Sequence, residues 1–120
     1  MESLNNRQFQ AVYKGGRSFS NKYLVMYIFE NNKEYNRLGI SVSKKVGNSV
    51  VRHRLARLIR ESYRHRQSEF NSGLDIVVIA RVNANTVKKC IEIESAMMHL
   101  ALRMGILNNE ENTDSVNRTL

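Results

Sequence analysis

Between Gly47 and Gly73 the sequence contains no glycine and no proline, and this uninterrupted stretch limits most strongly what the chain can fold into. Asn48 and Ser49 are favourable N-cap residues at its start. Apolar side chains then recur every three or four residues, at Val51, Leu55, Leu58, Ile59 and Tyr63. This spacing places them on one face of an α-helix. The stretch therefore predicts an amphipathic helix of about twenty residues.

Segments on both sides of this helix have the pattern of β-strands. Along 35–43, Leu38, Ile40 and Val42 alternate with small, polar or basic residues, which predicts one apolar face and one polar face. The run 74–82 is apolar almost throughout, as in a strand that is buried on both sides. A strand, a long helix and a second strand in this order predict a βαβ unit.

The beginning of the chain predicts a short helix and a strand. Segment 5–14 has an N-cap at Asn5 or Asn6 and ends at a pair of glycines, so we expect a helix there. Segment 17–30 contains a strand rich in aromatic and β-branched residues. Because apolar side chains alternate on both of its faces, we expect this strand to lie inside a sheet.

The end of the chain predicts a helix and a tail. Segment 86–104 has the pattern of a helix with two apolar stripes, one of which contains Ile91 and Leu102, so we expect packing on the sheet and on the first helix. The segment 108–120 is polar and rich in asparagine, and we expect it to be disordered.

Positive charge is concentrated around the long helix. From Arg37 to Arg66 there are nine Lys or Arg residues and a single acidic residue, Glu61. Such a face is often merely solvated, but here the charge is nearly all of one sign and is carried mainly by Arg, whose planar guanidinium suits phosphate. With a net charge of +8, nucleic acid is the first partner to test and an anionic membrane surface is the second.

The residues that could perform chemistry are scattered. Cys90 is the only cysteine, the three histidines are far apart, and the eleven carboxylates form no convincing pair. These observations predict a binding protein rather than a catalyst. No apolar run approaches the roughly 20 residues that span a bilayer, and the N-terminus lacks the apolar core of a signal peptide. We therefore expect a cytoplasmic protein.

The run SVSKKVGNSVVRHRLARLIRE, residues 41–61, closely resembles the signature of the bacterial ribonuclease P protein component. The resemblance covers about 6–107 and is strongest over 38–61. It implies an α+β fold, a single-domain αβββαβα sandwich over 1–107 with a small, mainly antiparallel sheet. It also implies a left-handed βαβ crossover, whereas almost all such crossovers are right-handed.

The resemblance also implies a function. In this family's enzyme the RNA subunit, with magnesium, hydrolyses the bond that frees the 5′ end of tRNA, and the small basic protein assists. The implied partners are that catalytic RNA and precursor tRNA, with no membrane and no obligate protein partner. Magnesium would be held mainly by the RNA and the substrate, and this chain would contain no catalytic and no metal-binding residue.

Two groups of residues correspond to the family's binding surfaces. The catalytic RNA would be contacted by Lys44, Lys45, Asn48, Arg52, His53, Arg54, Arg57, Arg60 and Arg64. The single-stranded 5′ leader of precursor tRNA would be held by Phe9, Tyr13, Tyr27, Arg37 and Ser41. For Phe9 and Tyr13, a place in the leader cleft and a place in the core remain equally open.

The chain departs from the family pattern in two places. His53 stands where the family has Asn between two arginines, and 1–9 contains only Arg7 where the family usually carries a basic extension. Two other functions remain as alternatives: a general binder of structured RNA, and a nuclease that works without RNA. The dispersed carboxylates disfavour the second.

Overall fold

The computed structural model describes residues 2–108, so the predicted tail, apart from its first residue, lies outside the described residues. The elements are β1 (Glu2–Ser3), α1 (Asn6–Gly15), β2 (Arg17–Ser20), β3 (Leu24–Glu30), β4 (Arg37–Ser41), α2 (Ser49–Arg66), η1 (Gln67–Glu69), β5 (Leu74–Ala80), η2 (Val82–Thr86) and α3 (Cys90–Met104). From α1 onward, the helices and strands other than the short 3-10 turns follow the predicted order αβββαβα. The two-residue strand β1 was not predicted.

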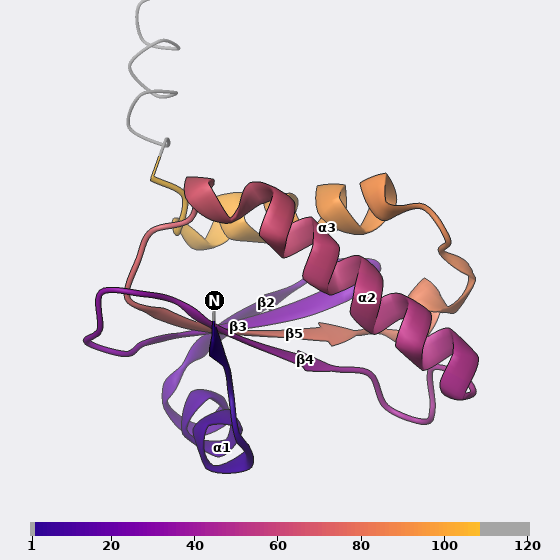
Figure 1. Cartoon of the computed structure of the whole chain (residues 1–120), viewed down its shortest axis with the longest axis horizontal. Coiled ribbons are helices and arrows are strands. Elements are labelled where there is room, and N and C mark those ends of the chain that lie inside the picture. Colours follow the sequence, from indigo (N-terminus) through magenta and orange to yellow (C-terminus); the bar gives the residue numbers. More distant parts are fainter. Residues whose placement is uncertain (1, 109–120) are drawn as a thin grey trace, which may run out of the picture.

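All five of these strands belong to one sheet, in the order β1-β4-β5-β3-β2. β4 lies parallel to β1 and β5, whereas β3 lies antiparallel to β5 and β2. The sheet is therefore mixed, with 11 antiparallel and 7 parallel residue pairs, so antiparallel pairing predominates as predicted. Because β4 and β5 are adjacent, parallel and joined through α2, the predicted βαβ unit is confirmed. α2 and α3 cover one face of the sheet, and α1 lies on the opposite face (Figure 1).

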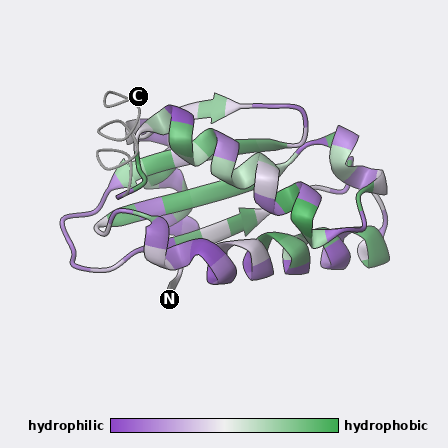
Figure 2. Ribbon diagram, turned by 90° about the horizontal axis from the view of Figure 1, so that it is seen from above, coloured by the Kyte–Doolittle hydropathy of each residue, from purple (hydrophilic) through white to green (hydrophobic). Residues whose placement is uncertain are grey.

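The long amphipathic helix forms as the sequence predicts. Asn48 is the N-cap, and its side-chain oxygen accepts a hydrogen bond from the backbone N–H of Val51 at 3.0 Å. Leu55, Leu58 and Ile59 are buried against the sheet. Figure 2 shows hydrophobic and hydrophilic residues alternating along α2 and mainly hydrophobic residues in the strands behind it. One face of α2 is therefore fixed by the core, and the other is left for solvent or a partner.

The two faces of the sheet carry cores of very different size. Between the sheet and the pair α2 and α3 lies a large cluster that includes Met26, Ile76 and Met97, all fully buried. In the described part of the chain, the hydrophobic cluster under α1 has three buried residues, Leu4, Val12 and Val77, and aromatic side chains pack around them. The small core is therefore flanked by partly exposed rings.

The prediction of a strand over 17–30 missed a turn. The segment is a hairpin, β2 and β3, because the Asn21 side-chain oxygen accepts hydrogen bonds from the backbone N–H groups of Tyr23 and Leu24. Such side-chain bonds favour a turn over a continuous strand. β3 itself lies between β5 and β2, which confirms that this strand is inside the sheet.

The last helix begins later than predicted and packs elsewhere. It starts at Cys90, because 82–86 forms the 3-10 turn η2 instead. It ends as predicted at Met104, where Gly105 adopts a left-handed conformation (φ 72°). Ile91 and Leu102, which were expected to be packed, are 62% and 56% exposed. α3 lies against α2 and the sheet, not against α1 (Figure 1).

Candidate nucleic-acid interface

The outer face of α2 is a stripe of basic residues. His53, Arg57, Arg60 and Arg64 all project from the side opposite the core and are exposed. The turn before the helix adds Lys44 and Lys45, which are exposed as well. We call these six residues the basic face. Their arrangement follows from the helical period, since the apolar residues of α2 face the sheet.

Three further residues predicted to contact RNA lie outside the basic face, and two of them, Asn48 and Arg54, have structural roles. Asn48 caps α2, as described above. Arg52 is half-buried, and its Nε is a buried nitrogen with no hydrogen-bond partner in the described part of the chain. Arg54 donates hydrogen bonds to the backbone oxygens of Asn85 and Val87, at 2.7 and 3.2 Å. Arg54 therefore holds the segment before α3 against α2.

The aromatic residues predicted for the leader lie together on the α1 face of the sheet. The ring centroids of Phe9 and Tyr13, both on α1, are 6.1 Å apart, and those of Tyr13 and Tyr27 are 5.0 Å apart with an edge-to-face geometry. All three side chains are half-buried, so each is both a part of the small core and open to solvent. The place of Phe9 and Tyr13 beside the core is therefore confirmed, and their place in a leader cleft stays a prediction.

A groove runs between α1 and β4 beside these rings. It has a volume of about 360 Å³ and is lined by Asn6, Phe9, Gln10, Tyr13, Ile40 and Ser41. Burial and the nearby Tyr27 raise the pKa of the Tyr13 phenol above its ordinary value, and a side-chain hydrogen bond with Ser41 lowers it by less. At neutral pH the ring is a neutral stacking surface. We call this set of residues, together with Tyr27, the aromatic groove.

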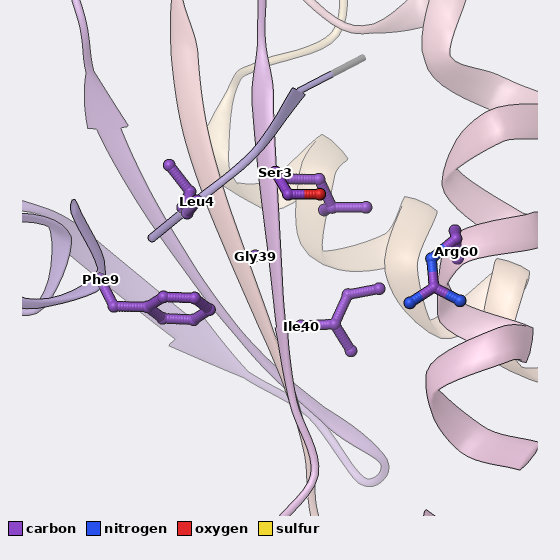
Figure 3. Close-up of a pocket in the computed structure, with 7 residues that line it drawn as sticks. Ser3, Leu4, Phe9, Gly39, Ile40 and Arg60 are labelled. Carbon is purple, nitrogen blue, oxygen red and sulfur yellow. The ribbon is translucent and has the colours of Figure 1, made fainter. Parts of the chain in front are cut away.

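A second pocket joins the aromatic groove to the basic face. It has a volume of about 190 Å³ and includes Phe9 on one side and Arg60 on the other. Figure 3 shows these two side chains on opposite sides of β4, with Gly39 and Ile40 between them. A ligand that crosses the β4 edge here would meet a ring from α1 and a guanidinium from α2.

Gly39 makes this approach possible, although it is not among the residues predicted for the site. A Cβ atom at this position would lie 2.6 Å from Cζ of Phe9, which is too close for a real contact. The ring therefore sits directly over the backbone of β4. An isolated glycine inside a strand pattern is a known sign of such a close approach, so the signal was present in the sequence.

Arg37 is placed differently from the other residues predicted for the leader. Its guanidinium forms a two-point ion pair with Asp75 at the start of β5, with Nε and Nη2 each 2.7 Å from a carboxylate oxygen. The side chains are only 13% and 3% exposed. Since Asp75 is buried, Arg37 neutralises a charge inside the fold.

The described residues offer no metal centre and no transmembrane helix. No group of three or more His, Cys, Asp or Glu side chains among them is placed to bind a metal ion. Within residues 2–108, no helix has the length and apolar character to cross a bilayer.

Comparison with known proteins identifies the family. The model of the family Ribonuclease P matches residues 3–105. The chain belongs to the ribonuclease P protein family. Its role is in the 5′ processing of tRNA, as a subunit of a ribonucleoprotein enzyme, so the family resemblance found in the sequence is confirmed.

Relatives and solved structures of the ribonuclease P protein family are similar to this protein over most of its length. The Ribonuclease P protein component of Lachnoclostridium phytofermentans is 61% identical over 111 residues, which cover 92% of this chain and 95% of the relative. The structure of the Staphylococcus aureus RNase P protein has a TM-score of 0.81 at 35% identity and covers 90% of this chain and 99% of the other. The Thermotoga maritima RNase P protein has a TM-score of 0.77 at 32% identity, covering 86% and 97%. The α+β fold is that of this family.

Proposed function

We propose that this chain binds the RNA subunit of ribonuclease P through the basic face and the 5′ leader of precursor tRNA through the aromatic groove. The observation that carries the proposal is the pocket at β4, which places Phe9 and Arg60 on either side of one strand. The two ligands would then lie side by side, with the end of the leader close to the catalytic RNA. The protein would position the substrate, and the RNA would supply the reacting groups.

The chemistry of the two surfaces supports this division. A stripe of exposed arginines and lysines suits a phosphate backbone, because binding releases the counterions that surround RNA. Half-exposed rings suit unpaired bases, and stacking of this kind is worth about 1–3 kcal/mol per base and is tolerant of sequence. A leader differs in sequence from one tRNA to the next, so a groove built from rings fits it better than one built from base-specific hydrogen bonds.

Magnesium would be held by the RNA and the substrate rather than by this chain. The described carboxylates fit this assignment, because the buried ones are engaged: Asp75 pairs with Arg37, and Glu94 accepts from His65 and Arg66. The protein would promote productive metal binding indirectly, by holding the substrate in place. Removal of the leader would take place in the cytoplasm, without a membrane and without an obligate protein partner.

The proposal is tested by cleavage of a precursor tRNA at low magnesium concentration. Three reactions are compared: nuclease-free protein alone, the family's catalytic RNA alone, and the two together. We expect cleavage at the mature 5′ end chiefly in the mixture. Cleavage by the protein alone would show a self-sufficient nuclease. Equal rates with and without the protein, together with equal binding to unrelated RNAs, would instead show a general RNA binder.

The aromatic groove is tested with the variant in which Phe9 and Tyr27 are both replaced by alanine. In the assembled enzyme this variant should bind precursor tRNA more weakly, by roughly tenfold if one stacked base is lost, and should bind mature tRNA unchanged. The matched control is Phe19→Ala, which removes an exposed ring from β2 at the opposite edge of the sheet. An equal loss of affinity for both tRNAs would show that the aromatic groove does not bind the leader.

A further inference from the structure

The segment between η2 and α3 lies along α2 and is attached to it at both ends. At one end Arg54 donates to the backbone oxygens of Asn85 and Val87. At the other end the Cys90 sulfur lies 3.4 Å from the Ser62 hydroxyl oxygen. Since Arg54 and Ser62 are two turns apart on α2, residues 85–90 run beside the middle of that helix.

Two lysines of this segment face solvent. Lys88 and Lys89 are exposed, and among residues 2–108 no carboxylate forms an ion pair with either of them. Lys88 is three residues beyond Asn85, whose carbonyl oxygen accepts from Arg54, and three residues cover at most about 10 Å. The backbone of Lys88 therefore lies close to the guanidinium of Arg54. The side of α2 that faces α3 therefore has two exposed lysines beside it, between the points where Arg54 and Ser62 hold the segment.

We propose that Lys88 and Lys89 bind the phosphate backbone of the ribonuclease P RNA as a lateral extension of the basic face, and that Arg54 is a positioning residue that holds them there. The basic face is otherwise one helix wide. With these lysines it becomes a patch that spans the side of α2 and the start of α3. The inference rests on the proposed function, because it extends the same RNA surface.

Charge and location favour RNA as the partner of this patch. Glu61 lies one turn beyond Arg57 on α2 and Glu92 lies three residues after Lys89 on α3, and neither forms an ion pair with Lys88 or Lys89. Lys88 and Lys89 lie on the α2 side of the sheet, whereas the aromatic groove lies on the α1 side. The patch is thus continuous with the surface proposed for the catalytic RNA and separate from the one proposed for the leader.

The test is the affinity of the full chain for ribonuclease P RNA, measured without substrate over a range of salt concentrations. In Lys88→Gln with Lys89→Gln, we expect affinity to fall about tenfold at low salt and the slope of log K against log salt to become shallower by about 1 to 2. The control is Lys14→Gln with Lys33→Gln, which removes the same charge from exposed positions elsewhere and should leave the slope nearly unchanged.

Arg54 is tested in the same assay. In Arg54→Gln, the two lysines lose their attachment, so adding Lys88→Gln and Lys89→Gln should cost much less affinity than it does in the wild type. Thermal melting shows whether each variant is folded, and Arg54→Lys, which keeps the charge but cannot span both carbonyls, should resemble Arg54→Gln. Full additivity of Arg54→Gln with the lysine changes would overturn the positioning role.

A fourth variant separates this inference from the function on which it rests. Arg57→Gln with Arg64→Gln removes two members of the basic face itself. If this variant binds RNA weakly while Lys88→Gln with Lys89→Gln binds with the wild-type affinity and salt slope, the extension is wrong and the proposed function stands. If neither variant changes RNA binding, both the extension and the proposed function are wrong.

Discussion

Gly39 controls how close the ring of Phe9 comes to the sheet. In Gly39→Ala, the new Cβ would have to displace Cζ of Phe9, which lies 2.6 Å from that position, and would meet Leu4 at 3.0 Å. The ring would be pushed into the aromatic groove. We expect the assembled enzyme to lose preference for precursor over mature tRNA by about fivefold, the equivalent of about 1 kcal/mol of stacking. Competition binding with the two tRNAs measures this ratio.

Ser18→Ala is the control for this change, because Ser18 is an exposed residue of β2 at the far edge of the sheet. It should leave the preference unchanged. If Gly39→Ala also leaves it unchanged while the protein stays folded, then the position of the Phe9 ring does not govern leader binding.

Single residues were harder to predict from the sequence than surfaces. The exposed basic residues of α2 could be placed, because the helical period alone puts His53 and Arg57 opposite the core. Arg37 and Arg54 could not, since their partners are far away in the sequence: Asp75 in one case and the carbonyls of 85 and 87 in the other. The sequence alone does not show whether a basic side chain contacts RNA or a buried acceptor of the same chain.

At the scale of elements, the junction of α2 with α3 is held by charge. Glu94 of α3 is nearly buried and accepts hydrogen bonds from His65, at 2.8 Å, and from Arg66, at 3.1 Å. Arg66 also pairs with Glu69 in η1. The bond from His65, followed by that from Arg66, holds the pKa of Glu94 below its ordinary value despite burial.

This junction should make the fold sensitive to acid. A carboxyl whose pKa is lowered in the folded state stabilises the protein above its unfolded pKa, and that contribution is lost as the pH falls through the folded pKa. In Glu94→Gln we expect the free energy of unfolding to drop by about 1–3 kcal/mol at pH 7. The difference from the wild type should shrink as the pH falls from the unfolded pKa of glutamate, about 4.3, through the lower folded pKa of Glu94, because the wild-type carboxyl then also becomes neutral. Urea unfolding at several pH values measures it.

Glu92→Gln serves as the control, because Glu92 is exposed on the same helix. It should change the free energy of unfolding by less than about 1 kcal/mol. A deficit of Glu94→Gln that stays constant from pH 7 to pH 3 would mean that packing, and not charge, explains its effect.

Elements with a strong period were predicted well, including several of their ends, but the turn at Asn21 and the start of α3 were not. α2 and β5 lie where apolar spacing puts them. The hairpin of β2 and β3 was read as one strand because the turn at Asn21 contains no glycine, only an asparagine whose side chain bonds the backbone. On α3, Ile91 and Leu102 fit a helical stripe equally well whether that stripe is covered or bare. The spacing of apolar residues shows which face of the helix is apolar, but it does not show what packs against that face.

At the scale of the whole molecule, the two proposed RNA surfaces should be separable by mutation. Arg57→Glu with Arg64→Glu should weaken binding of the catalytic RNA and reduce its salt dependence by at least about 1 per lost phosphate contact. Phe9→Ala with Tyr27→Ala should affect only the leader. Because β4 and the small core separate the two groups, their effects should add in the combined variant. Arg60→Gln should impair both, since Arg60 also lines the pocket shared with Phe9.

Assembly assays with the catalytic RNA alone, followed by precursor tRNA binding to the saturated complex, distinguish the two losses. Strong coupling between the double variant Arg57→Glu with Arg64→Glu and the double variant Phe9→Ala with Tyr27→Ala would show that one surface serves both ligands.

The order of the strands could not be predicted from the sequence. No local pattern shows that β5 takes the centre of the sheet or that β1 joins its edge.

The central place of β5 has a consequence for the time at which the protein can fold. β5 is the last of the described strands to be synthesised, yet it alone joins β3 to β4. Fifty residues separate the end of β3 at Glu30 from the end of β5 at Ala80, and a ribosome needs roughly 3 to 10 seconds to add them. During that interval β3, β4 and α2 have no common neighbour, and their apolar faces are uncovered. A nascent chain that stalls within α2 would therefore carry the basic helix with no sheet to hold it.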